Sequence, residues 1–96
     1  MFELRQTAEF ATWLAGLRDD RARKRIAMRL VRVSAGLFGD VKPVGAGVSE
    51  LRIDHGPGYR VYFVQRGKIL IVLLCGGDKG SQARDIELAK ALAKEV

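Results

Sequence analysis

Basic and hydroxyl side chains recur at alternate positions in two short stretches near the middle of the chain. Arg52 lies in the first stretch, and Arg60 and Tyr62 lie in the second. A guanidinium group is well shaped for bidentate contact with a phosphate, and a tyrosine adds an aromatic face and a hydroxyl. Lys79 and Gln82 follow the next apolar stretch and supply a further cation and an amide. These residue types together are suited to binding an anion.

Three strands are expected to position these side chains. Residues 48–54 and 59–66 alternate between apolar and polar side chains, and a third strand ends in the apolar run Ile69 to Cys75. Gly67 indicates a two-residue hairpin turn, which would pair Gln65 with Lys68.

One face of this sheet is expected to be apolar and to lie under two N-terminal helices. Its members are Leu51, Ile53, Val61, Phe63, Leu70, Val72 and Leu74. The opposite face would hold Arg52, Arg60 and Tyr62 beside Ile71, Leu73 and Cys75. Burying an arginine without a partner is costly. This second face should therefore be open to solvent and available to an anion, or its arginines should be neutralised by Glu50 or Asp85.

The N-terminal half is expected to form mainly helices. A short strand at residues 2–5 precedes a helix from Ala8 to about Leu17, for which Thr7 is a suitable N-cap. A second helix is predicted from Asp19–Asp20 to about Ala35. The glycine-rich residues 37–47 are predicted to form a loop that leads into the sheet.

The second helix is unusually basic. It carries six cations with no acid among them: Arg21, Arg23, Lys24, Arg25, Arg29 and Arg32. A charge run is most often a solvated face, but like charges one turn apart repel each other. The excess favours contact with phosphates, as basic clusters do on nucleic-acid-binding proteins.

A glycine-rich segment, Gly76-Gly77-Asp78-Lys79, leads from the third strand to a helix predicted from Gln82 to about Lys94 with Ser81 as its cap. Exposed N–H groups at the start of that helix, beside Lys79, would suit a phosphate oxygen. The spacing of a Walker A loop is absent.

Size and composition set wider limits. The 96 residues predict one domain, and the net charge of +6 favours an anionic partner, which could be nucleic acid, a membrane surface or an acidic protein. The single Cys75 and single His55 predict neither a disulfide nor a metal site. No cofactor is expected. The sequence shows no secretory signal or membrane-spanning run, so we expect a cytoplasmic protein without membrane contact.

Several segments resemble one known family. They are Leu51-Arg52-Ile53, Gly56 to Phe63 (GPGYRVYF) and Gly76-Gly77-Asp78-Lys79, followed by Gln82, Asp85-Ile86 and Ala89. Over nearly its whole length the chain is similar to the HigB/RelE-like toxins of bacterial toxin–antitoxin modules, in the branch of addiction module killer proteins. The resemblance implies an α+β fold, with two N-terminal helices on a twisted antiparallel sheet of about four strands and a C-terminal helix.

The same resemblance implies a function. Family members are mRNA endoribonucleases that cut codons in the ribosomal A site. A small helix-turn-helix antitoxin (HigA-like) neutralises them, and operator DNA is bound only through that antitoxin. On this basis the expected partners are the antitoxin, mRNA and the ribosome.

The resemblance also supplies candidate site residues. The catalytic candidates are Arg52, Arg60, Tyr62 and Lys79, and Gln82 is a candidate for RNA binding. The charge run of the second helix adds further RNA-binding candidates, which are Arg21, Lys24, Arg25, Arg29 and Arg32. RNA carries its own nucleophile, the 2′-OH, so the protein needs only to orient the chain, move protons and stabilise charge on the phosphate.

Each catalytic candidate can be given a role in that reaction. The two arginines would stabilise the transition-state charge, and Lys79 would contact phosphate or protonate the leaving group. Tyr62 would stack a base or orient the 2′-OH. Gln82 would bond RNA or only start its helix. The sole His55 lies in a turn, and no tyrosine follows Tyr62, which leaves the general base open.

Two other functions fit the same residues. One is a non-catalytic basic module that binds nucleic acid or an antitoxin, and the other is a domain whose cationic surface serves only to hold an acidic antitoxin. An assay of RNA cleavage separates both from the endoribonuclease.

Overall fold

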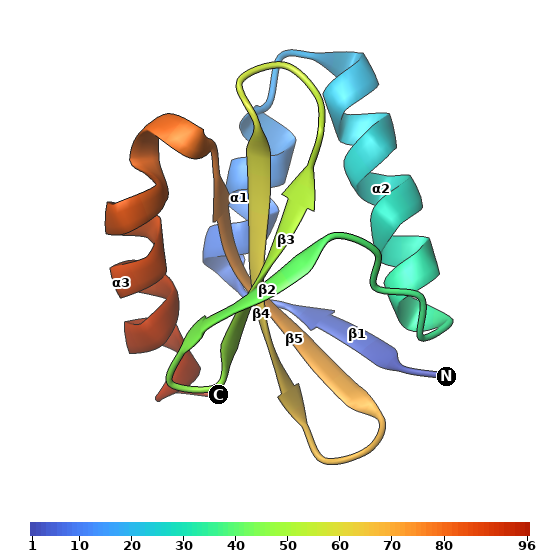
Figure 1. The fold of residues 1–96 in the computed structure, drawn as a ribbon, viewed down its shortest axis with the longest axis vertical. Coiled ribbons are helices and arrows are strands. Elements are labelled where there is room, and N and C mark those ends of the chain that lie inside the picture. Colours follow the sequence, from blue (N-terminus) through green and yellow to red (C-terminus); the bar gives the residue numbers. More distant parts are fainter.

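One mixed sheet of five strands runs through the computed structural model, which describes residues 1–96 (Figure 1). The strands are β1 (Glu3–Gln6), β2 (Val41–Gly45), β3 (Val48–Ile53), β4 (Tyr59–Arg66) and β5 (Leu70–Gly77). Their order across the sheet is β1-β5-β4-β3-β2. β1 lies parallel to β5, and the other neighbouring pairs are antiparallel.

Three α-helices cover the two faces of the sheet. They are α1 (Ala8–Gly16), α2 (Asp20–Ser34) and α3 (Gln82–Ala93), and a short 3₁₀ helix, η1 (Lys79–Ser81), leads into α3. α1 and α2 lie on one face and α3 lies on the other (Figure 1). No helix has the length and apolar character needed to span a bilayer.

The side chains at the helix starts explain where these helices begin. Thr7 caps α1 as predicted, since its hydroxyl accepts a hydrogen bond from the Phe10 N–H. Asp19 caps α2 by accepting from the N–H groups of Arg21 and Ala22. Ser81 occupies the predicted N-cap position of α3, but its side chain makes no cap hydrogen bond to the backbone of the helix.

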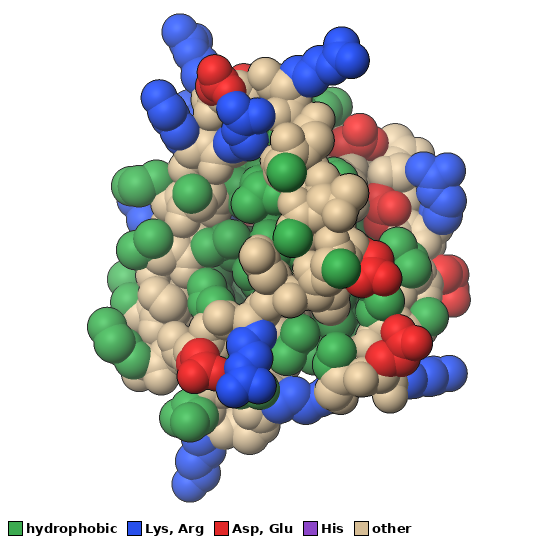
Figure 2. Space-filling view, turned by 180° about the vertical axis from the view of Figure 1, so that it is seen from behind, with side chains coloured by type: hydrophobic (Ala, Val, Ile, Leu, Met, Phe, Trp, Pro, Cys, Tyr) green, Lys and Arg blue, Asp and Glu red, His purple; other side chains and the backbone are tan.

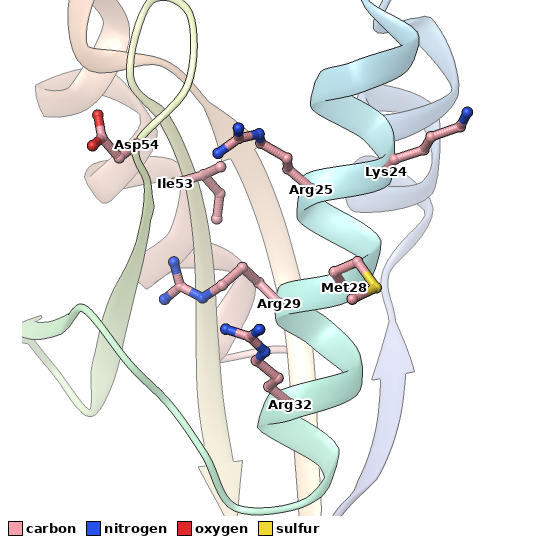
Figure 3. Close-up of a pocket in the computed structure, with 7 residues that line it drawn as sticks. All are labelled: Lys24, Arg25, Met28, Arg29, Arg32, Ile53 and Asp54. Carbon is pink, nitrogen blue, oxygen red and sulfur yellow. The ribbon is translucent and has the colours of Figure 1, made fainter.

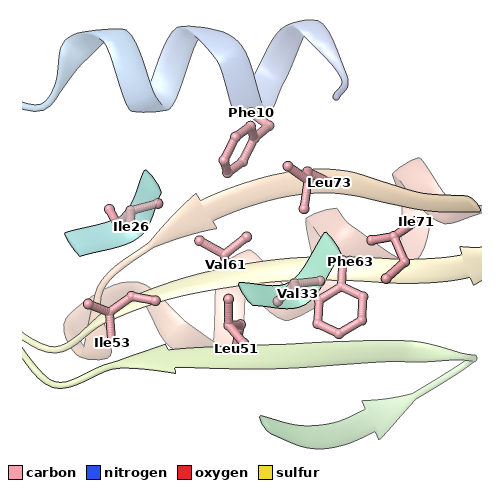
Figure 4. Packing of buried hydrophobic residues seen from close by; sticks show 9 residues of the cluster. All are labelled: Phe10, Ile26, Val33, Leu51, Ile53, Val61, Phe63, Ile71 and Leu73. Atoms are coloured by element: carbon pink, nitrogen blue, oxygen red, sulfur yellow. The ribbon is translucent and has the colours of Figure 1, made fainter. Parts of the chain in front are cut away.

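The core under α1 and α2 contains most of the apolar residues predicted for it (Figure 4). Phe10 from α1 and two α2 side chains pack onto the sheet. The nine buried members are Phe10, Ile26, Val33, Leu51, Ile53, Val61, Phe63, Ile71 and Leu73. Figure 2 shows the outside of these helices, where basic side chains gather toward the rim and hydrophobic side chains spread between them.

The predicted count of about four strands, all antiparallel, is corrected in two places. β1 pairs in parallel with β5, and residues predicted as loop contain β2. Four of the five β2 residues are exposed, so no apolar alternation marks the segment. β2 lies at the edge of the sheet, which is where a strand tolerates a residue such as Pro43 that has no N–H to donate.

The predicted register between β4 and β5 is also wrong. Arg66 pairs with Leu70, which leaves three residues in the turn, and Gly67 takes a positive φ of 66°. The pairing has therefore moved by an odd number of positions, so Ile71 and Leu73, rather than Leu70 and Val72, face the N-terminal helices.

An irregularity in β5 restores part of the predicted arrangement. The register shifts between Tyr62 and Phe63, as in a β-bulge, and Tyr62 lies opposite Cys75. These two residues share a face as predicted. α3 covers the part of that face around Tyr62 and Cys75, which forms a second core, so only its end at Arg52 and Arg60 lies at a groove.

Candidate functional site

Two predicted catalytic arginines meet in a groove beside the β3–β4 hairpin. Arg52 on β3 is the direct cross-strand partner of Arg60 on β4. The groove has a volume of about 330 Å³. It is lined by Asp40, Arg52, Ile53, Asp54, Gly58 and Arg60. Like charges directly opposite each other destabilise a sheet, so this pair needs compensation from a neighbour.

Glu50 provides that compensation and is the centre of a polar cluster under α3. It is fully buried. Its Oε1 accepts a hydrogen bond from Arg52 Nε at 3.2 Å and lies 3.8 Å from Arg60 Nε. Its Oε2 accepts from the Tyr62 hydroxyl at 3.0 Å and from Gln82 Nε2 at 2.7 Å. The predicted alternative of an ion pair with Glu50 is therefore present, whereas no salt bridge joins these arginines to Asp85.

The surroundings of Glu50 keep it ionised. Burial alone would raise the pKa of this carboxyl group. Hydrogen bonds from Gln82, Arg52 and Tyr62, with the nearby charge of Arg60, outweigh burial and hold the pKa below its ordinary value. The cluster therefore contains two guanidinium cations and one carboxylate.

Arg60 is the more enclosed of the two arginines. Its side chain is 13% exposed, whereas that of Arg52 is 34% exposed. The Nε of Arg60 is buried without a hydrogen-bond partner. An N–H group in this situation is rare in folded proteins and merits an explanation.

Tyr62 and Gln82 contact Glu50 rather than the groove. Tyr62 has no exposed surface, so in this structure it can neither stack on a base nor touch a 2′-OH. Burial, followed by the hydrogen bond to Glu50, raises the pKa of its hydroxyl far above the ordinary value. Gln82 is the first residue of α3, and its amide N–H donates a hydrogen bond to Glu50. Sequence reasoning treated Glu50 only as a potential ion-pair partner and so missed its central place.

Lys79 lies close to the arginines although it comes from a distant part of the sequence. Its backbone N–H donates to the carbonyl of Pro57 at 3.4 Å, which places η1 beside the β3–β4 hairpin. A methyl group added at Gly58 would lie 3.4 Å from Lys79 Cβ and 3.6 Å from Arg60 Nη1. Lys79 is exposed and lies next to Gly58, but it does not line the groove, so two of the four predicted catalytic residues, Arg52 and Arg60, line it.

The glycine-rich segment is explained by packing. A Cβ atom on Gly76 would lie 2.3 Å from the Trp13 ring, and one on Gly77 would lie 1.8 Å from Asp85 Oδ2. The carboxylate of Asp78 accepts hydrogen bonds from the N–H groups of Gly80 and Ser81. The predicted phosphate position at this turn is therefore occupied by a carboxylate of the chain itself.

A second hollow of about 380 Å³ lies between α2 and the end of β3 (Figure 3). Its lining consists of Lys24, Arg25, Met28, Arg29, Arg32, Ile53 and Asp54. In Figure 3, Arg25, Arg29 and Arg32 extend from α2 toward the sheet, whereas Lys24 and Met28 project elsewhere. Ile53 and Asp54 line both hollows, so the basic face of α2 adjoins the groove of the two arginines.

The cations of α2 differ in how free they are. Arg29 donates to the carbonyls of Arg52 at 2.5 Å, Phe38 at 3.0 Å and Asp40 at 3.3 Å, so it joins α2 to β3 and the loop before β2. Lys24, Arg25 and Arg32 are exposed and line the hollow, whereas Arg21 is exposed and lines neither hollow.

Carboxylates at the groove are a further feature that sequence reasoning did not identify. Asp40 and Asp54 line it and are exposed. Both follow or precede a strand in the sequence, but neither position carries a pattern that would have distinguished it. No group of three or more His, Cys, Asp or Glu side chains is placed to hold a metal ion.

Comparison with known proteins adds a family assignment. The model of the family described as "Phage derived protein Gp49-like (DUF891)" matches residues 12–94. An uncharacterized protein of Haemophilus influenzae is 47% identical over 94 residues, which cover 98% of this chain and 95% of that protein. Both matches include the arginine groove, Glu50 and α3. The chain belongs to the phage-derived Gp49-like family.

Proposed function

We propose that this chain is the toxin of a toxin–antitoxin module and acts as a ribosome-dependent mRNA endoribonuclease. Membership of the Gp49-like family supports a toxin, since that family is related to the addiction module killer proteins. The observation that carries the nuclease proposal is the cross-strand pair of Arg52 and Arg60 at a groove. Such a pair disfavours folding, so a binding role for its charge accounts for its presence.

The proposed reaction uses the 2′-OH of RNA as its nucleophile. The 2′-oxygen attacks the adjacent phosphorus, the bond from phosphorus to the 5′-oxygen breaks, and a 2′,3′-cyclic phosphate and a 5′-OH end result. Arg52 and Arg60 stabilise the charge that develops on the phosphoryl oxygens. Lys79, at the edge of the groove, contacts the phosphate or protonates the departing 5′-oxygen. Asp40 and Asp54 are the candidates to accept the 2′-OH proton, because both line the groove.

The remaining predicted residues fall outside the reacting centre in this proposal. Lys24, Arg25 and Arg32 on α2 contact phosphates of mRNA or ribosomal RNA beyond the groove, and Arg21 adds to the same field. Tyr62 and Gln82 support the site from beneath through Glu50. The proposed partner is a small helix-turn-helix antitoxin that alone contacts operator DNA, and the proposed compartment is the cytoplasm.

Expression in a bacterial host tests the proposal. Wild-type protein should arrest growth and create new 5′ ends within translated messages. Arg60→Ala should lower the cleavage rate at least about 100-fold, which is the loss typical of removing one transition-state donor. Arg5→Ala is the matched control, because Arg5 is an exposed arginine on β1, at the far side of the sheet from β3.

Each outcome of this test has a clear meaning. Cuts that disappear in Arg60→Ala but persist in Arg5→Ala would support the nuclease and its site. A folded wild-type protein that binds RNA but produces no arrest and no cuts would contradict the proposal and favour the non-catalytic binding module.

A further inference from the structure

We propose that Glu50 is a positioning residue whose buried carboxylate fixes the guanidinium groups of Arg52 and Arg60 so that both face one phosphate. This inference deepens the proposed function, and it rests on that function for the identity of the phosphate as RNA. The arrangement itself is independent of any reaction and can be tested with inorganic phosphate alone.

The two oxygens of Glu50 have separate tasks. Oε2 receives the Tyr62 hydroxyl and the Gln82 amide, which come from β4 and from the start of α3. These two donors fix the plane of the carboxylate from the protein interior. Oε1 is left to face the arginines, at 3.2 Å from Arg52 Nε and 3.8 Å from Arg60 Nε.

The edge of each guanidinium group that faces Glu50 determines which N–H groups remain free for a ligand. Both arginines approach the carboxylate through Nε. Neither makes a hydrogen bond within the protein through its terminal Nη atoms, and both line the groove. The terminal N–H groups, which suit bidentate contact with a phosphate, are therefore left for a ligand.

The charges of the cluster also indicate that Glu50 holds the two arginines in place. Two cations lie opposite each other on neighbouring strands, and one fully buried carboxylate lies beside both. Without that carboxylate the guanidinium groups would repel each other, and the largely covered Arg60 side chain would lose its only ion pair. The two groups would then move apart, and they would no longer converge on one ligand.

If Glu50 positions the arginines, its neutralisation should affect phosphate binding in the opposite direction from that expected if Glu50 only offsets charge. If Glu50 only offset positive charge, its neutralisation would strengthen attraction for an anion. If it positions the arginines, the same change would weaken binding because the donors would separate. A merely structural role would lower stability without a specific effect on the bound phosphate.

The experiment uses the full chain and three variants. Glu50→Gln removes the charge at nearly constant shape, and Glu50→Asp keeps the charge on a shorter side chain. Asp85→Asn is the matched control, since Asp85 is a buried carboxylate on the α3 side that accepts from Ser81 and forms no salt bridge with an arginine. Inorganic phosphate is titrated at low ionic strength while the arginine Nε–H signals are followed by NMR. Cleavage of a translated message is measured in parallel as kcat and KM.

Phosphate should shift the Arg60 and Arg52 signals of the wild type. Glu50→Gln should weaken phosphate binding at least tenfold and lower cleavage at least 100-fold, chiefly in kcat, and Glu50→Asp should recover part of both. Asp85→Asn should lower the melting temperature and leave phosphate binding unchanged. If Glu50→Gln fails to fold, Gln82→Ala removes one donor to Oε2, keeps the charge, and should weaken phosphate binding several-fold.

The two proposals can fail separately. Phosphate binding that depends on Glu50 in a protein that cuts no message would refute the nuclease and leave the positioning role intact. Phosphate binding that is equal or tighter in a folded Glu50→Gln variant would overturn the positioning role, as would a wild type that binds no phosphate. Unchanged binding in Gln82→Ala would also overturn it.

Discussion

Replacing Gly77 by alanine should destabilise the protein strongly, although the change adds only one methyl group. The added Cβ would lie 1.8 Å from Asp85 Oδ2, 2.7 Å from its Cγ and 2.9 Å from Ser81 Oγ. Ordinary contacts begin near 3.4 Å, so the carboxylate would have to retreat by more than an ångström. Asp85 is buried, and its hydrogen bond from Ser81 at 2.5 Å would break as it moved.

Two costs add in this variant. Forcing a methyl group into a packed site typically costs about 1–3 kcal/mol, and loss of a hydrogen bond to a charged group costs about 1.5–3 kcal/mol. We therefore expect the free energy of unfolding to fall by roughly 3–5 kcal/mol, which in a domain of this size lowers the melting temperature by at least about 10 °C. Thermal and urea unfolding followed by circular dichroism measure both quantities.

Two comparisons make the reasoning testable. Gly80→Ala should change stability little, because its Cβ would meet only the side-chain oxygen of Asp78 at 3.2 Å. Adding Asp85→Ala to Gly77→Ala removes the clashing group, so the double variant should lose less stability than the two single losses combined. A Gly77→Ala protein as stable as wild type, or strict additivity with Asp85→Ala, would refute the packing explanation of this glycine.

Three further predictions concern the polar cluster, the basic helix and the free thiol. The pKa of Glu50 is lower in the folded state than its ordinary value of 4.5, so its contribution to stability is complete above that pH and is lost as the pH falls through the folded pKa. Urea unfolding from pH 7 to pH 3 should show this loss of stability. In Glu50→Gln the stability should depend less on pH over the same range. Arg29→Ala should lower the free energy of unfolding by about 2–4 kcal/mol, because three backbone carbonyls each lose a hydrogen bond from the guanidinium group. Arg32→Ala should change it by less than about 0.5 kcal/mol and weaken RNA binding; equal stability losses in these two variants would contradict the distinction. Burial raises the pKa of the Cys75 thiol to about 12, so a thiol reagent should modify the native protein on the order of 1,000-fold more slowly than the unfolded chain, and rapid native labelling would show that the thiol is accessible.

The elements with strong local signals could be predicted from the sequence. The apolar stripe of α2, the Thr7 cap of α1 and the alternation in β3 and β4 each depend on neighbouring residues, and all appear in the structure. β2 could not be predicted, because its side chains are mostly exposed and Pro43 argues against a strand. The parallel pairing of β1 with β5 joins residues far apart in the sequence, and no local pattern encodes it.

The register error shows how one turn decides the faces of a strand. A two-residue and a three-residue loop at Gly67 are both compatible with the sequence, yet they place opposite sets of β5 side chains under α1 and α2. β5 is apolar on both faces because helices cover both, so alternation could not distinguish the two registers.

The proximity of Arg52 and Arg60 could be predicted from the sequence, whereas the surroundings of this pair could not. Arg52 and Arg60 are cross-strand partners in any register that pairs Leu51 with Val61, so their proximity follows from the alternation of apolar side chains. That α3 would cover their face could not be inferred, because the direction of a helix after a glycine turn depends on long-range packing. The glycine turn itself is closely packed, with Gly76 against Trp13 and Gly77 against Asp85 of α3.

The path of α3 also explains why arginines can occupy a covered face of the sheet. Along β3, the residues on this face are Val48, which is 1% exposed, Glu50, which is fully buried, and Arg52, whose side chain is 34% exposed. Exposure therefore rises toward the hairpin, where α3 begins and its cover ends. The carboxylate lies just inside this boundary and the guanidinium groups lie across it, so a buried anion and a solvent-facing ligand can contact the same two cations. A helix that began one turn earlier would close the groove, and one that began a turn later would expose Glu50 to water and weaken its hold on both arginines.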